Sequence, residues 1–281
     1  MSETAITIKK SNGETEVFSF EKLKASLQRS GASEAEIDLV FEKLKYELYN
    51  GITTKEIYKL AFKLLKKLDH LYASKYSLKK AVFELGPNGH PFEKLVGALL
   101  KQKGFKTEVS VILKGECVTH EIDVLAEKDG ISYAIECKFH SRTKTVSNVK
   151  VPLYINSRFL DIQKVWNQSE KTTKLEQGWL VTNTRFTDDA INYAKCVGLQ
   201  LMSWDYPKGN GISNNIDRFG LYPITALTVL KQYEKKQLIE KDIILITELL
   251  DSAHVMHELK IPKGRIVKIE NLIRKICNLH G

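Results

Sequence analysis

Three strand-like segments follow one another after a helical segment at Pro91–Lys103. Each contains β-branched and other apolar residues and is bounded by Gly-containing turns. They are Thr107–Leu113, His120–Glu127 and Ser132–Lys138. A turn at Lys128-Asp129-Gly130 predicts a hairpin between the last two of these strands.

A strand, a helix and another strand come later in the same part of the chain, at Gly178–Thr182, Thr187–Val197 and Gln200–Trp204. A helix between two strands is typical of a parallel pair with a right-handed crossover. A mostly helical or irregular stretch, Val149–Lys171, precedes them. The central segment therefore predicts a mixed-sheet α/β core.

Two loop-like stretches divide the chain into three domains. Residues Gly86–Pro91 and the Gly/Asn-rich stretch Pro207–Asn215 interrupt the helical and strand patterns. The predicted domains are 1–88, 89–215 and 216–281. The first has strands at Ala5–Ile8 and Glu16–Phe18 around an Asn-Gly turn, a pattern typical of a hairpin. Four helices are expected after it, at Phe20–Arg29, Glu34–Tyr49, Thr54–Leu68 and Ala73–Glu84, with Ser33 and Thr53 as N-caps.

The last domain is expected to be small and all-α. Leucine and isoleucine recur at helical spacing in three stretches, namely Thr225–Gln232, Glu240–Asp251 and Arg265–Leu279. The turn Leu259–Ile266 resembles a helix-hairpin-helix motif, in which backbone N–H groups hold a phosphate. A plain packing or dimerisation domain is the alternative, since Pro262 removes one donor.

Composition limits the function classes. The formal net charge of +9 favours a polyanionic partner such as DNA. The stretch Cys137–Leu160 carries five basic residues and no acidic one, which suits a phosphate-facing segment as well as a solvated loop. Four dispersed cysteines argue against a disulfide framework or a cysteine-ligated zinc site. Neither a membrane span nor a secretory signal is apparent, so a cytoplasmic protein is expected.

Three polar side chains interrupt two apolar strands. Side chains alternate along a strand, so Glu136 and Lys138 share one face of Ile131–Lys138. Asp123 lies between Ile122 and Val124 in the preceding strand. A hairpin through Lys128-Asp129-Gly130 would place Asp123 opposite Glu136. Facing carboxylates suit a hard cation such as Mg²⁺, and a neighbouring lysine can neutralise developing charge. Ordinary edge-strand charges are the alternative.

The segment H-E-I-D-V-L-A, followed after eight residues by I-E-C-K, resembles the signature of the PD-(D/E)XK nucleases, and most closely their Mrr-like restriction endonuclease group. The resemblance spans about residues 89–205, including the later G-W-L-V-T-N and F-T-D-D-A-I-N-Y-A elements. It implies Asp123 and Glu136 as ligands of Mg²⁺ or Mn²⁺, with the Cys137 carbonyl as a third. It also implies Lys138 as the catalytic lysine and Glu93 as the acidic residue of the first helix.

Further polar residues are candidates for the same groove. Lys150, Arg158 and Asp161 are expected to line it. A structural or phosphate-contacting role is expected for His140, with a ligand or proton-transfer role as the alternative, and His120 is expected to be structural.

The N-terminal segment resembles the ATP-cone, a regulatory nucleotide-binding domain. The resemblance rests on I-T-I-K-K-S-N-G-E-T-E-V-F-S-F-E-K-L-K and on the later G-I-T-T-K-E-I and A-S-K-Y-S-L-K-K-A-V-F-E-L-G-P. It implies ATP or dATP as an allosteric ligand, bound by Lys10, Lys22 and Thr54, with Glu16 and Lys9 beside them. Ser11 and Asn12 depart from the family pattern, which puts nucleotide affinity in question. A domain that has kept this fold without the ligand is the alternative.

Together these features predict a Mg²⁺-dependent DNA endonuclease of restriction or repair type, regulated by a nucleotide. A homodimer is expected, because a duplex has two strands to cut and each chain has one site. Two alternatives remain: a nucleotide-responsive DNA-binding regulator that does not cut, and a junction resolvase acting on branched DNA.

Overall fold

The computed structural model describes residues 6–10 and 13–278, and in it the chain forms two compact units. The first unit comprises Met1–Lys79, Ala226–Lys231 and Ile261–Gly281, and the second comprises Lys80–Thr225 and Gln232–Lys260. This division differs from three consecutive domains, because the C-terminal segment is shared between the units. The multidomain fold itself is as predicted: a helical N-terminal part with small strands, a mixed-sheet α/β core and C-terminal helices.

The first unit contains a small sheet and four helices from the N-terminal part of the chain. Strand β1 (Thr7–Lys9) pairs antiparallel with β2 (Thr15–Val17), and parallel with β3 (Ile52–Thr53), which the sequence pattern did not reveal. The turn residues Ser11 and Asn12 lie outside the described residues. The helices are α1 (Phe20–Arg29), α2 (Glu34–Lys45), α3 (Thr54–Leu68) and α4 (His70–Tyr76).

The predicted N-caps of α2 and α3 are confirmed. The Ser33 side chain accepts from the backbone N–H of Glu36, and Thr53 accepts from that of Glu56. Both glutamates reach back to the cap residue and complete capping boxes. One helix was expected over Ala73–Glu84. The structure instead has two, α4 and α5 (Leu78–Phe83), because the chain turns at Ser77.

Helix α13 (Lys263–Ile276) belongs to the first unit and contacts α4. Its buried apolar residues recur at helical spacing along one side, as the sequence predicted. Lys275 Nζ lies 3.7 Å from Asp69 Oδ2, at the N-cap of α4. The segment before α13 contributes as well, because His70 Nδ1 lies 2.7 Å from Thr228 Oγ1. The N-terminal helices thus share one unit with a helix from the far end of the described chain.

A five-stranded sheet forms the centre of the second unit, in the order β10-β8-β6-β5-β4. Its first three strands in sequence, β4 (Lys106–Lys114), β5 (Thr119–Lys128) and β6 (Ile131–Lys138), pair antiparallel, and the hairpin between β5 and β6 is as predicted. Strand β8 (Lys174–Thr182) runs parallel to β6, and β10 (Gln200–Met202) runs parallel to β8. Helix α8 (Asp188–Val197) connects β8 to β10, so the predicted parallel crossover is confirmed.

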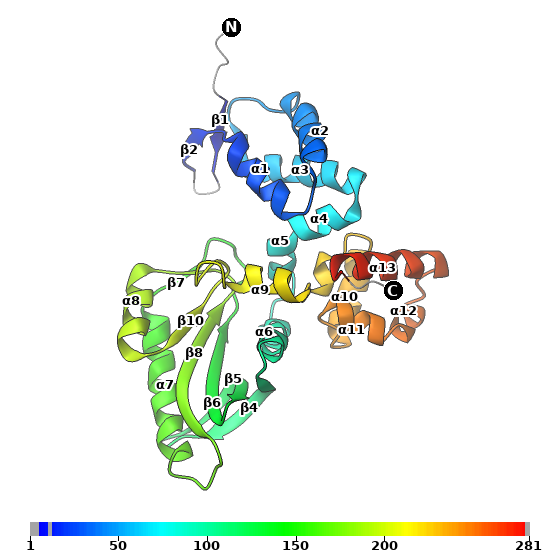
Figure 1. Cartoon of the computed structure of the whole chain (residues 1–281). Coiled ribbons are helices and arrows are strands. Elements are labelled where there is room, and N and C mark those ends of the chain that lie inside the picture. Colours follow the sequence, from blue (N-terminus) through cyan, green and yellow to red (C-terminus); the bar gives the residue numbers. More distant parts are fainter. Residues whose placement is uncertain (1–5, 11–12, 279–281) are drawn as a thin grey trace. The chain divides into compact units, whose positions relative to one another are not determined.

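Helices cover both faces of the sheet (Figure 1). Helix α6 (His90–Gln102) packs on β4, β5 and β6, while α7 (Lys150–Trp166) packs on β8, β4 and α8. The contact with α7 is close at Gly178 of β8. A Cβ atom there would lie 3.0 Å from the Phe159 ring and 2.9 Å from Leu199. Only glycine lets the helix approach the sheet this closely.

Short elements complete the second unit. The strand pair β7 (Val146–Ser147) and β9 (Arg185–Phe186) and helix α9 (Ile212–Phe219) were not predicted, and α9 begins inside the stretch expected to be a boundary. The expected helix over Thr225–Gln232 is wrong. Only a short 3-10 turn, η1 (Ile224–Ala226), forms before α10 (Gln232–Glu240). Helices α11 (Ile246–Asp251) and α12 (His254–Glu258) follow.

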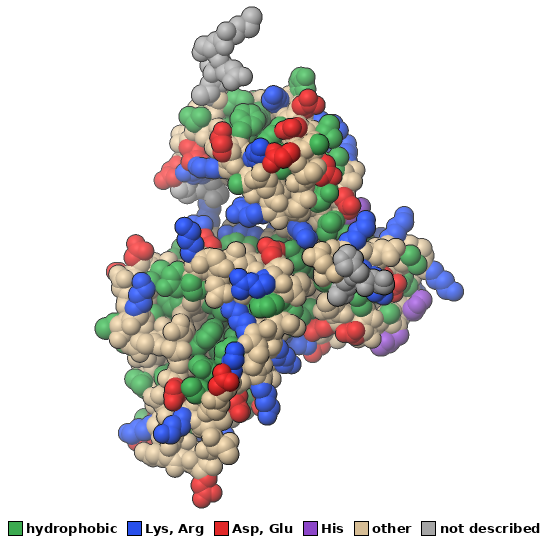
Figure 2. Space-filling view, viewed as in Figure 1, with side chains coloured by type: hydrophobic (Ala, Val, Ile, Leu, Met, Phe, Trp, Pro, Cys, Tyr) green, Lys and Arg blue, Asp and Glu red, His purple; other side chains and the backbone are tan. Residues whose placement is uncertain are grey.

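In the described residues, no helix combines the length and the apolar character that a membrane span requires. Lys and Arg side chains are interspersed with Asp and Glu over the visible surface (Figure 2), in keeping with the even charge distribution along the sequence. The four cysteines are free thiols.

Candidate active site

The β5–β6 hairpin brings two predicted carboxylates together. Its turn, Asp129-Gly130, has positive φ angles of 54° and 76°, as a two-residue hairpin turn requires. The paired register ends at Val124 and Ile135, so Asp123 and Glu136 are the next residues on the two strands. The backbone N–H of Cys137 donates to Asp123 Oδ2 at 2.6 Å. The hairpin therefore places Asp123 beside the strand that carries Glu136, as predicted.

Both carboxylates are shielded from water. Glu136 is only 8% exposed, and its burial, followed by the charge of Asp123, raises its pKa to about 8. Burial also raises the pKa of Asp123, although the hydrogen bond from the Cys137 N–H opposes that rise. Two buried carboxylates resist ionisation unless a cation compensates them. The electrostatics of this pair thus favour a bound positive charge.

A third carboxylate comes from helix α6. Glu93 lies in the first turn of α6, and burial and then the charge of Asp123 raise its pKa. His90 Nδ1 lies 3.5 Å from Glu93 Oε2. The structure therefore brings Glu93 into the electrostatic neighbourhood of Asp123 and Glu136. Three oxygen-donor side chains of this kind suit a hard divalent cation such as Mg²⁺ or Mn²⁺.

Lys138 lies at the end of β6, with an exposed side chain. Its charge acts on the carboxyl of Asp123 and lowers the pKa of that group, against the larger effect of burial. The Thr182 hydroxyl on β8 donates to the Lys138 carbonyl at 2.7 Å and so fixes the end of the strand. The site thus pairs buried carboxylates with an ammonium group that reaches solvent.

A cavity of about 330 Å³ opens beside Glu136 and Lys138. Residues of α7 form its other wall, and two of them, Lys150 and Arg158, were expected in this groove. The lining residues used below are Glu136, Cys137, Lys138, Lys150, Tyr154 and Arg158. Lys150 and Tyr154 are exposed, so the rim offers both a cation and an aromatic ring to an incoming ligand. This combination suits a phosphate backbone and an adjacent base.

Asp161 lies outside this lining. It accepts hydrogen bonds from the backbone N–H groups of Cys117 and Val118 and lies 2.7 Å from His120 Nε2. Glu116, Cys117 and Asp161 lie close enough to share an ion, but hydrogen bonds within this surface turn already engage Asp161. Asp161 therefore organises the β4–β5 turn and does not line the groove.

The two histidines have structural contacts. His120 lies between Asp161 and Arg158, whose Nε is 3.4 Å from His120 Nδ1. His140 exchanges backbone hydrogen bonds of 2.8 Å with the Asn183 side chain, and its Nε2 lies 3.1 Å from Ser147 Oγ. Burial and then the charge of Lys138 lower the pKa of His140. The contacts of His140 with Asn183 and Ser147 fit the structural role.

The predicted nucleotide contacts lie together in the first unit. Lys10 Nζ is 2.8 Å from Glu16 Oε2, and Lys22 Nζ is 3.5 Å from Glu16 Oε1. The hydrogen bond to Glu16 is the main cause that raises the pKa of Lys10. Lys9 pairs with Thr53 across β1 and β3, which brings Thr54, the first residue of α3, beside the same hairpin. The unsuspected strand β3 is the element that joins these residues.

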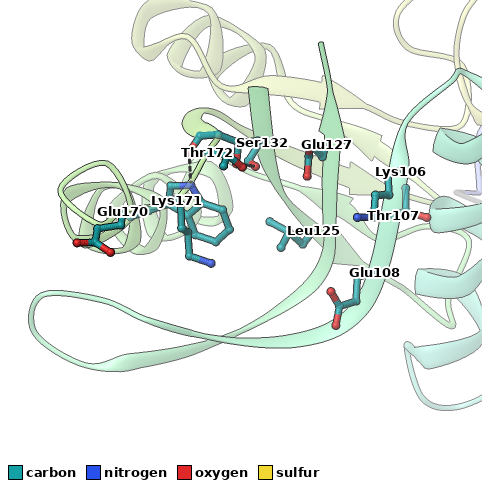
Figure 3. Close-up of a pocket in the computed structure, with 11 residues that line it drawn as sticks. Lys106, Thr107, Glu108, Leu125, Glu127, Ser132, Glu170, Lys171 and Thr172 are labelled. Atoms are coloured by element: carbon teal, nitrogen blue, oxygen red, sulfur yellow. Dashed lines mark hydrogen bonds between the residues drawn. The ribbon is translucent and has the colours of Figure 1, made fainter. Parts of the chain in front are cut away.

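A second cavity lies at the other end of the sheet, away from the carboxylates (Figure 3). It has a volume of about 590 Å³ and mixes cations, acids and threonines, among them Lys106, Glu108, Glu127 and Lys171. Lys171 Nζ lies 3.8 Å from the centre of the Trp166 ring. Acidic and basic groups alternate around it with no converging set, so it does not compete as an active site.

Three family models match consecutive parts of the chain. An ATP cone domain matches residues 6–81, a restriction endonuclease domain of the Mrr type matches 87–206, and an AF1548-like C-terminal domain matches 222–277. The middle match contains all four predicted catalytic residues, and the first contains all five predicted nucleotide contacts.

Relatives extend the comparison. An uncharacterized protein of Archaeoglobus fulgidus is 43% identical over 134 residues, which is 48% of this chain and 72% of the relative. The crystal structure of a protein of unknown function, AF1548, shares 33% identity with a TM-score of 0.54, covering 67% of this chain and 96% of that one. The MspJI restriction endonuclease, solved with a 27-mer oligonucleotide, matches at 11% identity and a TM-score of 0.33, over 60% of this chain and 35% of that one.

Proposed function

Because the chain belongs to the AF1548-like family and joins an ATP-cone domain to an Mrr-like restriction endonuclease domain, we propose that it is a metal-dependent DNA endonuclease controlled by a nucleotide. The endonuclease domain makes the protein a nuclease. The metal, the DNA substrate and the nucleotide control are the proposed parts.

The observation that carries the proposal is the placement of Asp123 and Glu136 on adjacent strands, with the Cys137 N–H holding the Asp123 carboxylate and the exposed Lys138 at the end of β6. The raised pKa values of Glu93, Asp123 and Glu136 support it. Burying three acids in one place destabilises a protein unless a ligand compensates them. Sites of this kind are maintained for function rather than for stability.

In the proposed reaction Asp123 and Glu136 would hold Mg²⁺ or Mn²⁺, with the Cys137 carbonyl and Glu93 as further ligands. A cation held there would supply polarisation of a phosphoryl oxygen and activation of water as the nucleophile. Lys138 orients the attacking water and neutralises charge that develops on the phosphate. The hydrogen bond from the Cys137 N–H fixes the direction of the Asp123 carboxylate before substrate arrives.

DNA is the proposed substrate because basic groups line the groove. Lys138, Lys150 and Arg158 surround the cavity beside Glu136, and Arg142 and Lys144 are exposed on the segment between β6 and α7. Such contacts follow the phosphate backbone and carry no base preference by themselves.

Nucleotide control is proposed from the first unit. Lys10, Lys22 and Thr54, with Lys9 and Glu16 nearby, would bind the phosphates of ATP or dATP. Lysines serve as point charges for phosphate, and the N-terminus of α3 adds backbone N–H groups. Nucleotide binding would shift an equilibrium between active and inactive forms of the protein.

Cleavage of supercoiled plasmid by the purified protein tests the nuclease and its site together. The parent is expected to nick or linearise DNA with Mg²⁺ or Mn²⁺ and to be inactive with EDTA. Asp123→Ala and Lys138→Ala should each lower the rate by roughly 10²–10⁴-fold, the range for a positioned charged group. Arg185→Ala is a suitable control, because Arg185 is exposed and pairs with Asp205 on the surface.

Two other outcomes distinguish the alternatives. DNA retained in a gel shift without cutting, unchanged by Asp123→Ala, would replace the nuclease with a DNA-binding regulator. Cutting confined to a four-way junction and absent from plasmid would indicate a resolvase. If ATP binds to the protein but plasmid is cleaved at the same rate with and without ATP, the proposed nucleotide control is wrong.

A further inference from the structure

Arg158 forms an ion pair with one of the candidate metal-binding carboxylates. From helix α7, its Nη1 lies 2.7 Å from Glu136 Oε1. This contact is an ion pair rather than a well-directed hydrogen bond, since Oε1 has no partner of good hydrogen-bond geometry. Both side chains are largely buried, with exposures of 17% and 11%. A guanidinium group keeps its charge at every pH that proteins tolerate.

The other nitrogens of Arg158 contact residues of strand β5. Nη2 donates to the Glu121 carbonyl at 2.5 Å, and Nε lies 3.4 Å from His120 Nδ1. His120 is fixed in turn by Asp161, at 2.7 Å. The Tyr154 ring lies 5.6 Å from the guanidinium carbon. Two nitrogens of the planar group thus have hydrogen-bond partners and the third has an ionic partner, and together these contacts define one position for the guanidinium group.

We infer that Arg158 is a positioning residue that fixes Glu136 and lowers the affinity of the site for a divalent cation. The inference rests on the proposed metal-dependent function. Arg158 takes Oε1 of Glu136 and leaves Oε2 for a metal ion. It thereby holds the carboxylate in place before any ion arrives, and Asp161 and His120 act through it.

The effect on metal affinity follows from Coulomb's law. A fixed positive charge beside a ligand carboxylate repels a divalent ion with twice the force that it exerts on a monovalent one. The same charge offsets repulsion among Glu136, Asp123 and Glu93 when no ion is bound. Removing it should therefore have two opposite effects: the protein without metal becomes less stable, while the metal ion binds more tightly.

Mn²⁺ binding to the full chain, measured by calorimetry at pH 8.5 without DNA, tests this inference. At this pH fewer protons compete for the carboxylates. Arg158→Ala is expected to lower the Kd for Mn²⁺ by about tenfold, equivalent to one pKa unit of interaction. Arg158→Lys keeps the charge, so its Kd for Mn²⁺ should stay near that of the parent. His120→Ala removes one contact that holds Arg158, so its Kd should lie between those of the parent and Arg158→Ala.

The neutral variant Arg158→Gln gives a second test if the alanine variant does not fold, and Arg185→Ala controls for the loss of an arginine elsewhere. If the role of Arg158 were merely structural, its replacement would lower the stability of the protein in EDTA without tightening Mn²⁺ binding. Unchanged or weaker Mn²⁺ binding by the neutral variants overturns the inference, as does a failure of parent and variants alike to bind Mn²⁺.

The plasmid assay separates this failure from failure of the proposed function. Metal-dependent cleavage with unchanged Mn²⁺ affinity in the Arg158 variants would refute the role of Arg158 alone. Tighter Mn²⁺ binding in those variants, without cleavage by the parent, would refute the nuclease alone.

Discussion

At the scale of single residues, the burial of Glu136 has a direct consequence for the stability of the protein without metal. Glu136 is 8% exposed and lies beside Asp123 and Glu93, and the single ion pair with Arg158 does not bring its pKa back to the usual range. A carboxyl in this position favours its neutral form until a stronger cation arrives. Stability without metal should therefore depend on pH through this residue.

Glu136→Gln should stabilise the metal-free protein at high pH but not at low pH. The folded-state pKa is about 8 and the ordinary value is 4.5, so between these values the folded state keeps a proton that the unfolded state has lost. Stability of the parent therefore falls as pH rises through this window and levels off above it. Relative to the parent, the variant should gain ~2–4 kcal/mol between pH 5 and pH 9.

Urea unfolding in EDTA at the two pH values measures this difference. Glu127→Gln, an exposed change on the same strand as Asp123, should show no comparable gain. An equal gain in both variants, or none in Glu136→Gln, would show that Glu136 is not the group responsible.

The sequence was sufficient to predict which carboxylates face each other, since strand alternation places Glu136 and Lys138 on one face and a short turn returns the chain to Asp123. It was not sufficient for Arg158. That residue was expected only to line the groove, because its contact with Glu136 depends on how α7 packs on the sheet. Asp161 was misplaced for the same reason: its partners lie in the turn at Cys117, far away in sequence.

At the scale of elements, close packing of α7 on β8 fixes the wall of the cavity that carries Lys150 and Arg158. Gly178 permits this approach, and Ala134 on the neighbouring strand β6 continues the same surface. Most helix and strand positions followed from periodicity and caps. The strand β3 was not predicted, because its two residues, Ile52–Thr53, are too few to show the alternation of a strand. Thr53 is also the N-cap of α3.

Gly178→Ala should destabilise the protein and lower cleavage together. The added methyl group would lie 3.0 Å from the Phe159 ring and 2.9 Å from Leu199, so α7 must shift. Overpacking of this kind costs about 1–3 kcal/mol. Chemical denaturation gives the stability, and the plasmid assay gives the rate.

Gly264→Ala is the matched control. Gly264 lies in the first turn of α13 with no atom within 4 Å of the added Cβ, so this variant should be neutral or slightly more stable. A Gly178 variant as stable as the Gly264 variant would show that the sheet and α7 have more room than the structure indicates.

At the scale of the whole molecule, the chain passes between its two compact units at Lys79, Thr225, Lys231 and Lys260. Local sequence patterns could not foresee this, because a helix's periodicity shows that one face is buried but not which partner buries it. The buried face of α13 was correctly expected, whereas its partner, α4, lies almost two hundred residues earlier.

Nucleotide binding to the first unit should depend on Lys10 and Lys22. Each lysine would contribute a point charge to the phosphates, so Lys10→Ala and Lys22→Ala should each weaken ATP or dATP binding by about tenfold. Calorimetry with the full chain measures this. Lys24→Ala is the control, because Lys24 lies on the same helix as Lys22 and pairs instead with Glu34 at 2.6 Å.

Ending the chain at Lys260 should destabilise the first unit more than the second. The change removes α13 and the Lys275–Asp69 ion pair, and it exposes the side of α4 that α13 contacts. Hydrogen exchange should show lost protection in α4, with the β5–β6 hairpin protected as before. Equal loss in both would contradict the division into two units.

The placement of α13 also bears on the order in which the protein matures during its synthesis. Domains generally fold one after another as the chain emerges, beginning with the N-terminal one. Here the strands and helices of the N-terminal part are made first, yet their unit lacks a helix until Ile276 has left the ribosome. The sheet that carries Asp123 and Glu136 can be complete earlier, when β10 has emerged. The unit proposed to regulate the nuclease would thus be finished after the nuclease sheet itself.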